Sequence, residues 1–335
     1  MSLRTAVQTL FESTHPSALD TAGQGKKLAI VVPCYNEQEV LPTTIRRLIE
    51  VRDKLALEGL IRADSSITFV DDGSRDQTWR LIEDGARAHA GVHGIKLSRN
   101  RGHQNALIAG LLHVDGDMVI SVDADLQDDL GAIRQMVLKY HDGCDIVYGV
   151  RSHRASDTFF KRFTAESFYR LLDLLGVDVV FNHADYRLMS RAAIEALKAY
   201  REVNLYLRGI IPQLGFRTDV VTYERAERFA GESKYPLTKM LALAWNGLTS
   251  FSPSPLRWIT GIGIVVSLFS FGIGGWALTA TLVFHTAIPG WASTVIPMYF
   301  LGGIQLLSLG IIGEYVSKIY LETKARPRFI IEKTV

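Results

Sequence analysis

The first 150 residues alternate short apolar runs with stretches in which apolar and charged residues recur at helical spacing. The apolar runs at residues 28–32, 67–70 and 118–122 each end in polar residues. This alternation is typical of βαβ units around a mainly parallel sheet. Ligands of such open sheets bind beyond the carboxyl ends of the strands. The sequence therefore predicts an α/β domain whose chemistry lies at the polar residues that follow these strands.

The pattern changes after Arg257, where a long segment carries no acidic or basic residue. Between Arg257 and Glu314 there is no Asp, Glu, Lys or Arg. Two apolar segments, 256–284 and 291–316, each exceed the roughly 20 residues that a helix needs to cross a bilayer. The uncharged link at 285–290 suits a short turn. A buried core hairpin is the alternative, and we expect a two-helix transmembrane hairpin.

The basic residues predict how this hairpin is oriented. Positive residues flank both outer ends of the hairpin, at Arg257, Lys318, Lys324, Arg326 and Arg328, so the positive-inside rule places both ends in the cytoplasm. The first 26 residues have no apolar run long enough for a signal peptide. We therefore expect the N-terminal tail, 1–26, to stay in the cytosol as well.

Two amphipathic stretches carry aromatic residues and cations, one at 156–175 and one at 236–251. Such a stretch packs either on the core of the domain or at a membrane surface, with its cations near headgroups or a lipid phosphate. The second stretch leads directly into the first apolar segment. We therefore interpret residues 236–255 as an interfacial helix and linker.

Charge and cysteine content exclude other classes of protein. The formal net charge is only +2, which does not favour a nucleic-acid-binding protein. Cys34 and Cys144 lie far apart in apolar settings, without the spacing of a zinc site or a redox pair. We expect buried, reduced thiols, as in a cytosolic domain.

The acidic run that follows the third apolar segment is the strongest local signal. In an extended segment Asp123 and Asp125 point to the same side, which suits two oxygen ligands of Mg²⁺ or Mn²⁺. Such an ion could neutralise the charge that develops on a departing diphosphate. Alone, this run could equally be a solvated acidic loop.

The ends of the two earlier strands supply further candidates. Tyr35 and Glu37 follow the first strand, and Asp71 and Asp72 follow the second. Carboxylates there can accept hydrogen bonds from a nucleotide base, on which an aromatic ring could also pack. The alternative for the second stretch is a turn in which Asp76 or Thr78 caps a helix.

Taken together in order, these motifs resemble the inverting GT-A glycosyltransferases of family 2, through Pro33-x-Tyr35-Asn36-Glu37, Asp71-Asp72-Gly73-Ser74-x-Asp76, Asn100-x-Gly102 and Asp123-x-Asp125-x-Gln127. The later motifs and the two apolar segments narrow this resemblance to polyisoprenyl-phosphate glycosyltransferases, such as bactoprenol glucosyltransferases and dolichol-phosphate-mannose synthases. The resemblance covers residue 27 to the end. It includes Asp185-Tyr186-Arg187-Leu188-Met189, Gly231-Glu232-Ser233-Lys234-Tyr235 and Ala325-Arg326-Pro327-Arg328.

This resemblance implies a Rossmann-like GT-A catalytic domain over 27–235, and then the interfacial segment, the spans and a cytosolic tail at 317–335. The nucleotide-sugar would contact Pro33, Tyr35, Glu37, Asp71, Asp72, Asp123 and Gln127. The metal would be held by Asp123, Asp125 and Gln127. The residues implied for catalysis are Asp123, Asp125 and Asp185.

The acceptor implied by the resemblance is a lipid phosphate, which is already an anion and needs little deprotonation. We therefore expect Asp185 to orient the sugar or a basic partner such as Arg187, and not to act as the base. An anionic acceptor needs cations instead. The candidates are Lys234 with Ser233, which we favour, and Arg151, Arg162, Arg208 and Arg228; for Arg151, Arg162 and Arg208 the alternative is a surface cation without a ligand.

The function implied is transfer of one hexose, glucose from UDP-glucose, to undecaprenyl phosphate at the inner (cytoplasmic) membrane of a bacterium. Single transfer is favoured because Arg257-Trp258 lacks the preceding Gln of the processive synthases' Gln-x-x-Arg-Trp motif. Other donors, namely UDP-N-acetylglucosamine, UDP-galactose, a UDP-aminoarabinose derivative or GDP-mannose, are alternatives. A non-catalytic, nucleotide-sensing membrane module is the alternative of another class. We expect a homo-oligomer, with a tetramer as one option.

Overall fold

The computed structural model describes residues 25–151, 183–203, 207–224, 254–282 and 290–335. Several predicted features lie outside these residues. They are both amphipathic stretches, most of the N-terminal tail and of the link between the apolar segments, and the candidate phosphate-binding residues Arg162, Arg228, Ser233 and Lys234.

The described part of the catalytic domain begins with the predicted alternation of strands and helices. The three predicted strands are present as β1, β2 and β4, so this prediction is confirmed. In chain order the elements are β1 (Leu28–Cys34), α2 (Leu41–Leu57), β2 (Ser66–Asp71), α3 (Thr78–Ala88), β3 (Val92–Leu97), α4 (His103–His113), β4 (Met118–Ser121), α5 (Gly131–His141), β5 (Ile146–Arg151), β6 (His183–Ser190), α7 (Arg191–Lys198), α8 (Leu207–Gln213) and β7 (Thr218–Tyr223).

These seven strands and the C-terminal strand β8 (Ile331–Thr334) form one eight-stranded sheet, in the order β7-β5-β6-β4-β1-β2-β3-β8. The neighbours β3, β2, β1 and β4 are parallel, whereas β6 runs antiparallel to both β4 and β5. All of β1 is buried, because helices cover both faces of the central parallel strands. This mostly parallel α/β sheet is the GT-A architecture that the sequence predicts.

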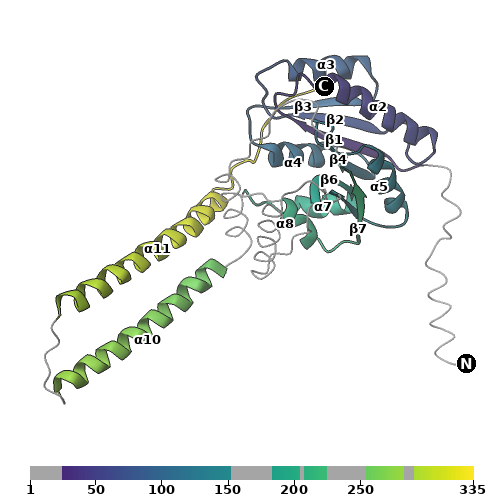
Figure 1. The fold of residues 1–335 in the computed structure, drawn as a ribbon. Helices are drawn as coiled ribbons and strands as arrows, with labels where there is room; N and C mark the ends of the chain where they lie inside the picture. The colour runs from purple at the N-terminus through teal and green to yellow at the C-terminus, as the bar shows by residue number, and fades with distance from the viewer. Residues whose placement is uncertain (1–24, 152–182, 204–206, 225–253, 283–289) are drawn as a thin grey trace, which may run out of the picture.

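Helices pack on both faces of the sheet (Figure 1). Leu48 of α2, Ile82 of α3 and Met136 of α5 belong to one apolar core, whereas α4, α7 and α8 contribute to the other. Helix α4 lies close to the sheet at Gly110, where an added Cβ would come within 2.3 Å of Val31 Cγ1. This close packing fixes the position of α4 on the sheet. The first residue of α4, His103, lies at the carboxyl edge of the sheet.

The C-terminal region contains two long helices, α10 (Ser254–Leu282) and α11 (Trp291–Thr323), which run side by side away from the sheet (Figure 1). Among the described residues, Phe300–Thr323 is the segment long and apolar enough to cross a membrane. Its large apolar side chains, such as Phe300 and Leu306, are exposed, which supports membrane association. Helix α10 overlaps the predicted first span, and the two-span hairpin stays a prediction.

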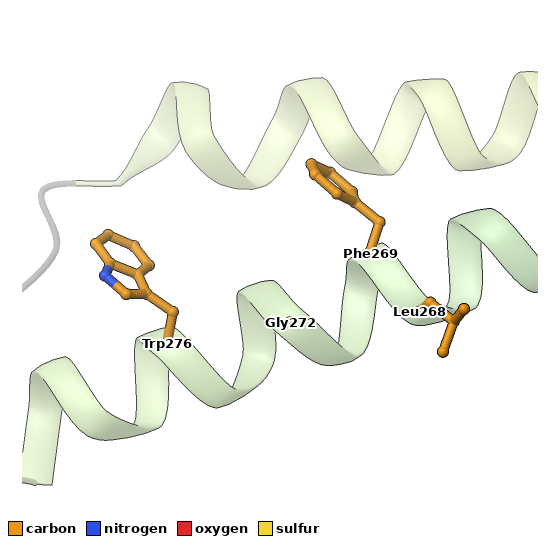
Figure 2. A pocket seen from close by; sticks show the side chains of 4 residues that line it. All are labelled: Leu268, Phe269, Gly272 and Trp276. Carbon is orange, nitrogen blue, oxygen red and sulfur yellow. The ribbon is translucent and has the colours of Figure 1, made fainter.

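An open apolar hollow of about 360 Å³ lies along α10 and is lined by Leu268, Phe269, Gly272 and Trp276. Gly272 leaves room between the two aromatic rings, which point toward α11 (Figure 2). None of these four described residues is charged. The exposed surface there is therefore apolar, as a lipid-facing helix requires.

The end of the chain returns to the sheet. Helix α11 continues past residue 316, where the predicted second span ended, and Ala325, with a φ of 44°, follows soon after its end. Strand β8 (Ile331–Thr334) then pairs antiparallel with β3. The sequence analysis predicted only a tail here. Because β8 covers the edge of β3, it satisfies backbone groups that would otherwise be open to another chain.

Candidate active site

The loops after β1 and β2 are joined by hydrogen bonds at the carboxyl edge of the sheet. The amide of Asn36, whose φ is 54°, donates to Ser74 Oγ over 2.9 Å, and Asn36 Oδ1 accepts from the amide of Arg75 over 2.9 Å. The amide of Glu37 donates to Thr78 Oγ1 over 2.8 Å. Tyr35 is 41% exposed beside this joint. The two loops therefore form one unit, with an aromatic ring open to a ligand.

The two aspartates at the end of β2 hold neighbouring loops. The Asp72 carboxylate accepts from the amides of Arg101 and Gly102, over 2.7 and 2.8 Å. Asp71 is fully buried and accepts from the Ser74 amide over 3.1 Å. Burial raises the pKa of both carboxyls, and these hydrogen bonds oppose the shift. Asp72 thus joins the end of β2 to the start of α4.

The Asp76 carboxylate contacts the start of α3, but the N-cap of this helix is Gln77, without a side-chain cap hydrogen bond, so neither Asp76 nor Thr78 is the cap. Asp76 Oδ1 accepts from the amide of Thr78, the first residue of α3, over 3.0 Å, and its Oδ2 accepts from the amide of Gln38 over 3.3 Å. The residue therefore supports the loops rather than facing an open site.

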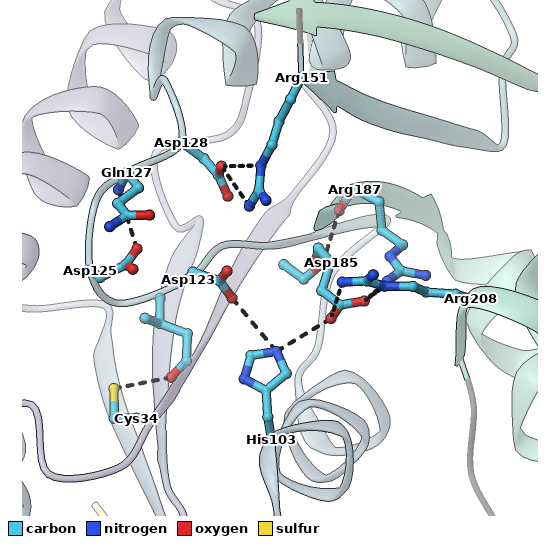
Figure 3. A network of polar contacts seen from close by, with 12 residues as sticks. Cys34, His103, Asp123, Asp125, Gln127, Asp128, Arg151, Asp185, Arg187 and Arg208 are labelled. Carbon is cyan, nitrogen blue, oxygen red and sulfur yellow. Dashed lines mark hydrogen bonds and ion pairs between the residues drawn. The ribbon is translucent and has the colours of Figure 1, made fainter. Parts of the chain in front are cut away.

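The acidic run after β4 does not continue as a strand. Strand β4 ends at Ser121, the chain then turns, and Leu126 has a φ of 52°. The expectation that Asp123 and Asp125 point to the same side of an extended segment is therefore wrong. Asp123 points toward His103, whereas Asp125 lies beside Gln127 and accepts from its amide over 3.2 Å (Figure 3).

Asp123 has an unusual electrostatic setting. Burial raises the pKa of this carboxyl to about 6; His103 opposes the shift, whereas the carboxylates of Asp128, Asp185 and Asp125 add to it. Several hard oxygen ligands thus share a small region, in which Asp128 and Asp185 are each paired with arginine. Such a region favours binding of a cation together with an anionic ligand.

Asp185 on β6 lies between two arginines (Figure 3). Arg187 Nη2 donates to its Oδ1, and Arg208 of α8 contacts both carboxylate oxygens over 3.4 Å. Burial alone would raise the pKa of Asp185, but the two guanidiniums outweigh burial and hold the pKa well below its usual range. Asp185 and Arg187 share a side of β6 because alternate residues of a strand point the same way.

His103 connects the two acidic centres. Its Nε2 lies 3.6 Å from Asp123 Oδ1 and 3.6 Å from Asp185 Oδ2. His103 is the first residue of α4, and this helix is held against the sheet at Gly110. The packing of α4 therefore positions the His103 side chain. The structure thus places His103 between two of the predicted catalytic aspartates.

A second buried cluster surrounds Asp128, which sequence reasoning did not single out. Its Oδ1 accepts from Tyr223 Oη over 2.6 Å. It also accepts from Arg151 Nη2 over 3.2 Å (Figure 3). Arg151, a predicted phosphate ligand, is thus paired with a carboxylate and remains partly exposed. The partners are separated by 23 and 95 residues in the chain, so no local motif indicates this cluster.

The structure brings together several of the predicted residues that it describes. Asp123, Asp185, Arg208 and His103 meet at one place, with Asp125 and Gln127 in the adjoining turn. Within the described ranges, no three His, Cys, Asp or Glu side chains form a ready metal cluster. Mg²⁺ sites often use one or two carboxylates together with substrate phosphates, so the oxygen ligands present still fit such an ion.

A mainly parallel α/β sheet with acidic residues at its carboxyl edge is typical of enzymes that bind nucleotides. It does not by itself identify which reaction they catalyse. Comparison with known families is more specific, because residues 29–198 match the model described as glycosyl transferase family 2. The chain belongs to this family and is a glycosyltransferase, as the motifs in its sequence indicate. Family membership favours an enzyme over the non-catalytic membrane module.

Several relatives are similar over nearly the whole chain. An uncharacterized glycosyltransferase, YkoT, of Bacillus subtilis (strain 168) is 53% identical over 91% of each chain. The SfII prophage-derived bactoprenol glucosyl transferase of Shigella flexneri is 41% identical over 92% of this chain and 98% of its own. Among solved structures, glucosyl-3-phosphoglycerate synthase from Mycobacterium tuberculosis, in complex with Mn²⁺, UDP and phosphoglyceric acid, gives a TM-score of 0.43 at 17% identity, covering 67% of this chain and 77% of that one.

Proposed function

We propose that this glycosyltransferase moves a single glucose from UDP-glucose to undecaprenyl phosphate, with inversion, at the cytoplasmic face of a bacterial inner membrane. The name of the Shigella flexneri relative supports the glucose and the lipid acceptor. The apolar segment at the end of the chain supports a site close to lipid. The two-span hairpin and a homo-oligomer, such as a tetramer, belong to the same proposal.

The setting of Asp185 carries the mechanistic part of the proposal. A carboxylate whose pKa is held well below its usual range by Arg187 and Arg208 is a poor base at neutral pH. A phosphate acceptor does not need a base, because its oxygen is already an anion. In the proposed reaction that oxygen bonds to the anomeric carbon, and the bond from this carbon to the nucleoside diphosphate breaks on the opposite face.

The donor would lie at the carboxyl edge of the sheet, along Pro33, Tyr35, Glu37, Asp71 and Asp72. Tyr35 is exposed enough to pack on a base, whereas Asp72 keeps acceptor capacity beyond its two loop hydrogen bonds. Mg²⁺ or Mn²⁺ bound by Asp123, Asp125 and Gln127 would supply positive charge to the leaving diphosphate.

The acceptor phosphate would meet the cationic side of the site. Arg208 reaches Asp185 from α8 with 35% of its side chain exposed, so it can contact a ligand while paired. Arg151 is also partly exposed beside Asp128. Lys234 with Ser233, and Arg162, complete the proposed phosphate ligands. Together these cations would reduce the repulsion between two phosphorylated substrates.

The decisive experiment is mass spectrometry of the lipid product after the purified protein is incubated with undecaprenyl phosphate and, in separate reactions, each candidate nucleotide-sugar. We expect a monohexosyl lipid from UDP-glucose, no product without the lipid or after chelation of divalent metal, and a β anomer by NMR from an α-linked donor. A lipid bearing another sugar would redirect the proposal to that donor. A product with several sugars, or an α anomer, would contradict it.

A further inference from the structure

The end of α11 is fastened to the catalytic domain at a short segment, residues 200–203, that follows α7. Glu322, in the last turn of α11, accepts a hydrogen bond from the Val203 amide over 2.8 Å. Just beyond the helix, Arg328 Nη2 donates to the Tyr200 carbonyl oxygen. Two side chains from the end of the membrane-associated helix thus hold both ends of this segment.

The held segment leads directly to the helix that carries Arg208. Val203 and Leu207, the first residue of α8, are four positions apart, so the chain can separate them by at most about 14 Å. At the start of α8 the Leu207 amide donates to Gln104 Oε1 over 3.1 Å, and Arg208 then contacts Asp185. The held segment therefore limits where α8, and with it Arg208, can lie.

The strand after α11 keeps this anchor in place. Backbone hydrogen bonds link Gly94 and Val335 in both directions, at 2.9 and 3.0 Å, beyond the β3–β8 ladder. Lys333 pairs with Glu83 over 2.5 Å. The Phe329 ring packs edge-on against His113, at the last turn of α4. The end of α11 therefore cannot move without breaking contacts to the sheet.

Three charged side chains, Glu202, Glu322 and Arg328, lie near one another where the end of α11 meets residues 200–203. Burial raises the pKa of Glu202, and the nearby Glu322 adds to this shift, whereas Arg328 opposes it. Arg328 is half-buried and lies close to both carboxylates, whose charges oppose the lowering of its pKa by burial. Removing it would leave these carboxylates to repel each other.

We propose that Glu322 and Arg328 are positioning residues that fix α8, and with it Arg208, relative to the membrane helix α11. This inference rests on the proposed contact of Arg208 with the acceptor phosphate. As a consequence, the helix α11 that associates with the membrane also positions Arg208, the proposed cation for the lipid phosphate. The two residues act through Arg208 and do not touch either substrate.

The test uses the full-length protein in vesicles that contain undecaprenyl phosphate. Glu322→Ala and Arg328→Ala should each raise the KM for the lipid about tenfold, the scale of one lost hydrogen bond to a charged group, with the donor KM unchanged. Glu322→Gln should keep the lipid KM close to the wild-type value, because the Gln amide oxygen can still accept a hydrogen bond from the Val203 amide. Glu332→Ala, on β8 and paired with Lys96 on the sheet edge, is the matched control and should leave both KM values unchanged.

A double-mutant cycle with Arg208→Ala connects the effect to the active site. If Glu322 acts through Arg208, adding Glu322→Ala to Arg208→Ala should raise the lipid KM no further. Additive effects, an unchanged lipid KM in Glu322→Ala, or an equal loss for both substrates would overturn the inference. An unchanged lipid KM in Arg208→Ala would also overturn it, whereas the proposed function itself is tested separately, by the identity and anomer of the lipid product.

Discussion

The substitution Asp185→Asn tests whether Asp185 acts as a buried counter-ion of arginine or as a general base. The change keeps the shape of the side chain and removes its charge. Asp185 is 11% exposed and Arg187 is 1% exposed, so Arg187 would lose its buried partner. Breaking a buried pair in this way costs about 3–5 kcal/mol. We expect the lower end, about 3 kcal/mol, because the Asn oxygen can still accept one hydrogen bond from Arg187.

For a domain of this size, about 3 kcal/mol corresponds to a fall in Tm of roughly 6–12 °C. Adding Arg187→Met removes the stranded charge and should recover most of that loss. The surface variant Glu195→Gln, which breaks surface pairs with Lys198 and Arg191, is the control and should change stability by less than about 1 kcal/mol.

The pH dependence of the Asp185→Asn variant follows from the sign of the pKa shift. The pKa of Asp185 is depressed, so its pairing contributes stability above the pKa of an unfolded aspartate and loses it only in strong acid. The wild type should therefore be the more stable protein throughout pH 6–9, and the residual activity of the variant should not recover with pH. Thermal unfolding and transfer rates across this range test both statements. An unchanged Tm, or activity that returns as the pH rises, would refute the reasoning.

Three further predictions concern the metal site, the packing of α4 and the C-terminal strand. Because Asp123 has a raised pKa of about 6, apparent Mn²⁺ affinity in activity titrations should fall about tenfold per pH unit below that value, and a constant affinity would remove Asp123 from the metal site. The same shift should make this residue's contribution to stability decrease as pH rises from about 4 to 6. Gly110→Ala should destabilise the protein by about 1–3 kcal/mol in denaturant unfolding, because of overpacking against Val31, whereas Gly85→Ala, with an added Cβ 3.1 Å from Ile45 Cδ1, should be better tolerated. Deleting residues 329–335 should lower the Tm and promote aggregation in light scattering through the exposed β3 edge, and a monodisperse variant of unchanged Tm would contradict this.

Parts of the site could be predicted because they follow directly from strand ends. Asp72 and Asp123 each come within two residues of an apolar run that became a buried strand, so their place at one edge of the sheet is a local property. The conformation of the turn after β4, which carries Asp123 and Asp125, could not be predicted from the neighbouring residues in this way. Leu126 adopts a positive φ, and the chain folds back where an extended segment was expected.

Contacts between distant segments were beyond sequence reasoning. Tyr223 reaches Asp128 across 95 residues, and Val203 meets Glu322 across 119. Strand β8 is short and mostly exposed, so it carries no apolar alternation that would distinguish it from a tail. Its pairing depends on the open edge of β3, which exists only once the sheet has formed.

Hydrophobic periodicity and residue order, taken from the sequence alone, determined the α/β class, the family and the apolar C-terminal helix, because each is encoded by neighbouring residues. The tertiary structure decided the charge states and partners in the site. The pKa values of Asp123 and Asp185 move in opposite directions although both are buried aspartates. The difference lies in the two arginines that β6 and α8 bring to Asp185, and only folding places them there.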